Sequence, residues 1–169
     1  MQTAETKKSS ATVCTFPNIN PAEDAIKQRH YNDYYRVFSN YRFFPNETVK
    51  IEPAEGPKNL HLVCFNRTIG ETEYVELLRA IGKRPCRNAP AYLTCLVVQV
   101  PEDKMPAELR NKHIVAAEPD NKFSVFTDEF CFPCFRCVRR DSGGRELRLI
   151  RVGGDWLGTW AFLAEDLVP

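Results

Sequence analysis

Residues 60–81, LHLVCFNRTIGETEYVELLRAI, are the stretch that decides the fold class. The compact apolar run at 60–65 predicts a core strand. Acidic residues open the segment 70–81 and Gly82 follows its last apolar residue. This pattern predicts a helix, because carboxylates stabilise its N-terminal end and glycine favours its C-terminal turn. A strand followed directly by a helix indicates a mixed α and β protein.

The chain on either side predicts further elements. Asn20 can cap a helix, Pro21 suits its first position, and aromatic residues then share one face, so a helix is expected over 21–39. The segment 92–100 is rich in β-branched residues and predicts a buried strand. Other apolar runs predict strands at 49–52 and 113–117, with one or two helical turns at 106–111.

The last third of the sequence predicts a three-stranded β-meander. Strand-like runs at 135–140 and 145–152 flank the Gly-containing loop 141–144, as in a β-hairpin. A last strand is expected at 160–163. We therefore predict an α+β fold, in which two helices cover a mainly antiparallel sheet that ends in this meander.

The composition is that of one globular domain. The chain has 169 residues, of which 43% are hydrophobic and 27% are charged. These values argue against a membrane-spanning, collagen-like, coiled-coil or wholly disordered protein. Residues 1–12 are polar and predict a flexible tail, and 13–169 are expected to form a single domain. The net charge of +1 argues against a bulk nucleic-acid binder.

The sequence has seven cysteines, and their number helps to infer the cellular compartment of the protein. An odd number leaves one thiol outside any complete set of disulfides, and no apolar signal segment follows the N-terminal lysines. We therefore expect a cytoplasmic protein whose cysteines are reduced and mostly buried as small hydrophobes. A mature fragment of a longer secreted precursor is the alternative.

Cys131, Cys134 and Cys137 are spaced so that their thiolates can reach one zinc ion. A structural zinc site needs a fourth ligand, for which the candidates elsewhere are Cys64, Cys86, Cys95 and His113. The phenylalanines between the cysteines favour another interpretation, in which this strand fills a core. We expect no cofactor, with zinc as the alternative.

The predicted hairpin is rich in arginine, and a basic β-ribbon can bind an acidic protein surface or follow phosphates. The alternative is a solvated outer face of the sheet. The candidate binding residues are Arg136, Arg139, Arg140, Arg145, Arg148 and Arg151.

Aromatic residues supply a second candidate surface. Tyr34 and Tyr35 lie among seven aromatic residues in a stretch of fourteen, and tyrosine is enriched at protein interfaces. Their alternative role is to cover the sheet of the same domain. Trp156 and Trp160 can likewise line a pocket or close the core.

Three stretches, in this order, resemble a group of known sequences. They are GETEYVELL at 70–78 with Ile81-Gly82, AYLTCL at 91–96 followed by HIVAAEP at 113–119, and WAFL at 160–163. They are similar to uncharacterised hypothetical proteins from genomes of uncultured candidate-phylum bacteria, over roughly 60–165. The resemblance implies a bacterial, cytoplasmic setting. It implies no activity and no catalytic residue.

The sequence holds no catalytic constellation, and the expected function is a non-enzymatic binding module. A protein partner is favoured, nucleic acid is a possible ligand of the basic hairpin, and no membrane partner is expected. One alternative is a zinc-stabilised domain that contacts nucleic acid. Another is a small cysteine-dependent enzyme, which requires an exposed thiol near a histidine, for example Cys64 with His113.

Overall fold

A computed structural model describes residues 11–20, 43–45, 56–100, 102–117, 126–128, 133–141, 144–151 and 153–167. Its helices are α2 (Glu73–Ala80), α3 (Ala89–Gln99) and the short 3-10 helices η3 (Glu102–Lys104) and η4 (Ala107–Leu109). Its strands are β1 (Thr12–Ile19), β2 (Phe43–Pro45), β3 (Lys58–Cys64), β4 (Lys83–Pro85), β5 (His113–Val115), β6 (Phe126–Asp128), β7 (Pro133–Asp141), β8 (Gly144–Arg151) and β9 (Trp160–Asp166).

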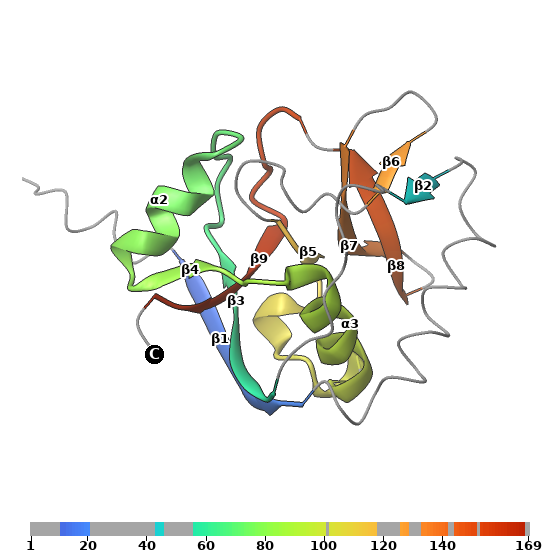
Figure 1. Cartoon of the computed structure of the whole chain (residues 1–169). Coiled ribbons are helices and arrows are strands. Elements are labelled where there is room, and N and C mark those ends of the chain that lie inside the picture. Colours follow the sequence, from blue (N-terminus) through green and yellow to red (C-terminus); the bar gives the residue numbers. More distant parts are fainter. Residues whose placement is uncertain are drawn as a thin grey trace, which may run out of the picture.

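All the described strands join one sheet (Figure 1), whose main path is β1-β3-β9-β5-β7-β6-β2, while β4 pairs with β9 and β8 with β7. β9 is central, with β3 along one edge and β5 followed by β4 along the other. The β5–β9 pair is parallel, and the other pairs are antiparallel. The predicted α+β class with a mainly antiparallel sheet is therefore confirmed.

The strand–helix unit at 60–81 forms as expected. β3 includes most of the apolar run at 60–65. The helix α2 starts at Glu73, three residues after the predicted start at 70. The Glu73 carboxylate accepts a hydrogen bond from the Gly70 backbone N–H at 2.7 Å, which satisfies a donor just before the helix. Gly82 has φ +75°, the left-handed conformation that ends the helix.

The predicted strand at 92–100 is wrong, because this segment is the helix α3. Pro90 lies at its start, where the missing N–H matters least. Tyr92, Leu93 and Leu96 are at most 1% exposed, and the helix is covered by other elements on several sides. A helix buried this way is apolar all round and shows no 3.6-residue period, so it resembles a buried strand.

The sheet separates two apolar cores. Leu62, Ala161 and Leu163 point to the face covered by α3, whereas Val63 and Phe162 point to the face covered by α2. Figure 1 shows these two helices on opposite sides of β3 and β9. Because both faces of β9 are covered, consecutive residues of this strand belong to different environments.

The C-terminal hairpin is confirmed, but the third strand of the meander lies elsewhere. β7 and β8 pair from Cys134 opposite Arg151 to Asp141 opposite Gly144. β9 lies beside β3 and β5 rather than beside β8. Its apolar residues are buried from both sides, which is the environment of a central strand rather than of an outer one.

Several other expectations have mixed outcomes. The strand at 113–117 is present as β5, and the turn at 106–111 as η4. β1 was not predicted, and it starts at Thr12, at the end of the expected tail. The predicted helix at 21–39 and strand at 49–52 lie outside the described residues. None of the helices in the described ranges is both long and apolar enough to cross a membrane.

Candidate functional site

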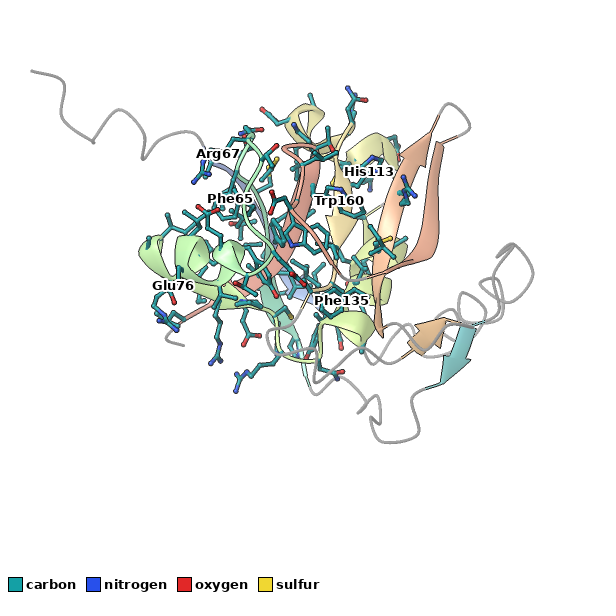
Figure 2. The ribbon with its side chains drawn as sticks, turned by 90° about the horizontal axis from the view of Figure 1, so that it is seen from above. Phe65, Arg67, Glu76, His113, Phe135 and Trp160 are labelled. Carbon is teal, nitrogen blue, oxygen red and sulfur yellow. The ribbon has the colours of Figure 1, made fainter. Side chains whose placement is uncertain are left out.

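The inner end of the hairpin is anchored in the body of the protein. Phe135 and Cys137 belong to the core on the α2 face, and Val138 belongs to the core on the α3 face. Figure 2 shows Phe135 within the side-chain-filled interior. β5 pairs with β7 at residues 137–138, and β6 pairs with it at 133–134. The hairpin is therefore held along its first half.

The outer end of the hairpin extends past these neighbours. Among the described residues, the ladder from Arg139 opposite Glu146 to Asp141 opposite Gly144 has no third strand beside it. Arg139 is exposed. Three of the six predicted arginines, those at 139, 140 and 145, occupy this projecting part.

Two arginines occupy opposed positions in this projecting ladder, Arg140 on β7 and Arg145 on β8. Like charges directly opposite one another destabilise an antiparallel pair. Strand alternation assigns Arg136, Arg140, Arg145 and Arg151 to ladder positions on the face of Val138, and Arg139 and Arg148 to positions on the face of Cys137. The hairpin thus carries basic positions on both faces.

The predicted metal ligands are not gathered in the described part of the chain. Cys137 is fully buried in an apolar core, Cys134 lies on β7, and Cys131 lies outside the described residues. No group of three or more His, Cys, Asp or Glu side chains within the described ranges could hold a metal ion. The zinc alternative gains no support from these ranges.

The pair proposed for a cysteine nucleophile is separated by the sheet. Cys64 and Ile114 both lie opposite Ala161, whereas His113 lies opposite Trp160, one position along β9. Residues in register share a face, so Cys64 and His113 belong to opposite faces. The Cys64 thiol donates to the Gly158 carbonyl at 3.2 Å. The ring centroid of His113 lies 5.0 Å from that of Trp160, as Figure 2 also shows.

Trp156 is a core residue in the structure. It is 6% exposed, its indole N–H donates to the Glu71 carbonyl at 3.0 Å, and its ring makes edge contacts with Trp160 and Phe162. Of its two possible roles, closing the core fits these contacts. Tyr34 and Tyr35 lie outside the described residues.

A basic cluster that sequence reasoning missed surrounds Glu165, whose side chain is 7% exposed. The Lys58 Nζ lies 2.9 Å from its Oε2, and the Nε atoms of Arg84 and Arg87 each lie 2.8 Å from its Oε1. Burial alone would raise the pKa of Glu165. The hydrogen bonds from Lys58 and Arg87, with the charges of Lys58 and Arg84, outweigh burial and lower the pKa.

A different set of polar contacts lies on the α2 face, one residue further along β9. Asp166 accepts from Lys83 Nζ at 3.2 Å, and the Nε2 of buried His61 lies 3.0 Å from the same Oδ1. Although His61 Nε2 and Asp166 Oδ1 are close, their geometry is not that of a hydrogen bond. Burial, followed by the charge of Lys83, lowers the pKa of His61 despite the opposing effect of Asp166. The lowered pKa favours the neutral imidazole.

The cations of the Glu165 cluster are not close to Glu165 in the sequence. Lys58 and Glu165 are 107 residues apart, and Arg84 and Glu165 are 81 apart. Their contact follows from the placement of β4 and β3 around β9, which spacing along the chain does not encode. The one available hint was a glutamate following an apolar strand run at 160–164.

Comparison with known proteins identifies no relative that would assign this site. No protein-family model matches the chain, and no curated protein or solved structure is significantly similar to it.

Proposed function

We propose that the chain is a non-enzymatic binding module whose projecting β7–β8 hairpin docks on an acidic protein surface. The observation that carries the proposal is the opposition of Arg140 and Arg145 in the ladder. Two like charges held opposite one another weaken the hairpin in isolation. An acidic partner would place carboxylates beside both arginines, and their attraction would offset the repulsion between the arginines. The arrangement therefore favours binding over the stability of the free hairpin.

A protein partner is preferred to nucleic acid on two grounds. The net charge is only +1, whereas nucleic-acid-binding domains usually carry a clear basic excess. The basic positions are also divided between the two faces of the hairpin rather than gathered on one. A two-sided ribbon suits an acidic groove better than a single phosphate track.

The expected setting is the cytoplasm. Cys64, Cys86, Cys95 and Cys137 are buried. Their burial supports a role as small hydrophobes in a reducing compartment.

The proposal is tested by fluorescence anisotropy with a labelled polyglutamate peptide, and with a single-stranded oligonucleotide of equal charge as the rival ligand. The wild type is expected to bind the peptide more tightly at equal ionic strength. Arg140→Glu is expected to weaken peptide binding about tenfold, because it reverses one charge of the opposed pair.

The matched control is Arg79→Glu, which makes the same charge change at an exposed arginine of α2 that contacts Glu76. It should leave binding nearly unchanged. Equal losses in the two variants would reduce the effect to net charge and refute the hairpin as the binding surface. Tighter binding of the oligonucleotide would replace the protein partner with nucleic acid.

A further inference from the structure

The cluster around Glu165 has more cations than its carboxylate requires. Lys58, Arg84 and Arg87 all contact this one carboxylate, so the group of four carries a net charge of +2 at neutral pH. One cation is enough to pair a buried carboxylate. The adjacent contacts of Asp166 do not offset the surplus, because Ala164 and Asp166 belong to the α2 face and Glu165 to the α3 face.

The two guanidinium groups use only a small part of their hydrogen-bonding capacity. Arg84 and Arg87 each donate through Nε to the same Oε1 atom. In the part of the chain that the structure describes, their terminal Nη atoms contact no acceptor. The side chains are 31% and 68% exposed, so these donors are accessible from solvent. Arginine forks of this kind suit the oxygens of carboxylates and phosphates.

The carboxylate keeps the arginines in place. Glu165 lies opposite Arg84 in the β4–β9 ladder, and Arg87 follows β4 by two residues. Lys58 lies over the Tyr92 ring, 4.5 Å from its centroid, and the Tyr92 hydroxyl donates to the Gly56 carbonyl. The three cations are therefore positioned before any ligand arrives, which lowers the entropic cost of binding one.

We propose that Arg84, Arg87 and Lys58, oriented by Glu165, form a binding site for a phosphate-type dianion. A dianion matches the surplus of +2, and a phosphomonoester is largely dianionic at pH 7 because its second pKa is about 6. The Nη donors of the arginines supply the hydrogen bonds, and Lys58 supplies a nearby point charge. This site is on the α3 face of the sheet, where β4 pairs with β9, and it is separate from the projecting hairpin.

The test is isothermal titration of the full chain with inorganic phosphate at constant ionic strength in chloride. Saturable binding at one site is expected. Arg87→Gln should weaken it about tenfold or more, while Lys58 and Arg84 still pair Glu165 and keep the fold. Arg79→Gln is the matched control, because it removes an exposed arginine that contacts a single carboxylate, Glu76. Its affinity should equal that of the wild type.

O-phosphoserine and adenosine monophosphate, titrated in parallel, distinguish the sources of the phosphate group. Equal affinities would support a site for the phosphate group alone. A tighter phosphoserine or nucleotide would support a site that also contacts that molecule. Binding of none of the three would overturn the proposal, as would equal binding by Arg87→Gln and the wild type.

Amide chemical shifts of the wild type locate the site even if a variant fails to fold. Phosphate is expected to shift the resonances of residues 84, 86–89 and 165. Shifts confined to 139–146 would place phosphate on the hairpin and overturn this site while leaving the proposed function intact. Conversely, peptide binding that Arg140→Glu leaves unchanged would refute the hairpin as the binding surface without affecting the result for phosphate.

Discussion

Arg84 and Glu165 face each other across the β4–β9 ladder, and Arg84 Nε lies 2.8 Å from Glu165 Oε1. The ion pair thus coincides with a backbone pairing that attaches β4, a strand of three residues, to the centre of the sheet. Glu165 is buried and contacts three cations, so its loss would leave all three without this paired anion. The first prediction follows from this dependence.

Glu165→Gln is expected to lower the free energy of unfolding by about 1.5–3 kcal/mol, the range for hydrogen bonds to charged groups. The loss arises because three cations keep their positions without the anion that pairs them. Urea denaturation measures it. Glu76→Gln removes an exposed pair with Arg79 and should change stability by less than about 1 kcal/mol. Equal effects of the two substitutions would mean that the buried position of Glu165 contributes nothing.

His61 is expected to make stability fall as the pH drops below its ordinary pKa of 6.5. Burial and Lys83 lower its pKa in the folded state, so the unfolded chain binds the proton first. Stability rises with pH wherever the unfolded state binds more protons, so protection is complete above 6.5 and is lost towards the lower folded pKa. His61→Gln should flatten this part of the curve.

The comparison uses urea denaturation of the wild type and His61→Gln at about pH 7.5 and about pH 5.5. The difference between the two proteins cancels the contributions of His30 and His113. A wild type that gains stability relative to the variant on acidification would reverse the sign and contradict a lowered pKa.

Two neighbouring hairpin substitutions are expected to have opposite effects. Arg140→Glu places a glutamate opposite Arg145 and should stabilise the chain by about 0.2–1 kcal/mol. Arg139→Glu places a glutamate opposite Glu146 and should destabilise it by a similar amount of about 0.2–1 kcal/mol. Thermal denaturation of both variants gives the two signs. Shifts of the same sign would show that the cross-strand register does not control hairpin stability.

Gly158→Ala is expected to destabilise the chain by about 1–3 kcal/mol, as overpacking does. A Cβ at this position would lie 2.8 Å from the backbone N of Arg67 and 2.9 Å from the carbonyl carbon of Asn66. Gly70→Ala is the control, because its Cβ meets only the Glu73 side chain at 3.6 Å or more. Urea midpoints provide the test, and a Gly158→Ala midpoint equal to that of the control would contradict the close approach.

Of the five cysteines whose exposure the structure gives, Cys14 is expected to react first with iodoacetamide in the folded protein. It is partly exposed, whereas Cys64, Cys86, Cys95 and Cys137 are buried. Even so, its reaction should be slow, because burial and then the charge of Glu108 raise the pKa of its thiol. Peptide mass spectrometry after a timed reaction gives the order. Rapid labelling of Cys64 would revive the cysteine-dependent enzyme that its buried position disfavours.

Some elements can be predicted from the order of apolar and polar residues along the chain, because this order reflects which sides of the element are buried. The buried residues of α2, Tyr74 and Leu78, are four apart, which is the spacing of one helical face. β3 is buried on both faces from Leu60 to Cys64, and a short continuous apolar run is the pattern of such a strand. The β7–β8 hairpin was predictable because a Gly-containing turn separates two strand-like runs. By contrast, the sequence of α3 wrongly predicts a strand, because burial on several sides removes the periodic signal of a helix.

The candidate sites also differ in whether their residues lie within one stretch of the chain or are brought together by the fold. The arginines of the hairpin were visible because they lie within one stretch, from 136 to 151. The role of Trp156 was open in the sequence, and its contact with Glu71 depends on a bridge between Ile69 and Trp156. The separation of Cys64 from His113 depends on the register of β3 and β5 against β9.

The sequence by itself determined the α+β class, the strand–helix unit at 60–81 and the basic hairpin, because each depends on interactions between residues close in the chain. Only the tertiary structure decided that β9 lies between β3 and β5, and with it the meeting of Lys58, Arg84 and Arg87 at Glu165. The physical reason is that strand order and register depend on which apolar faces are buried together over long separations. A shift of one residue in the register of β9 would move each of its side chains to the other face of the sheet, and no local pattern sets this register.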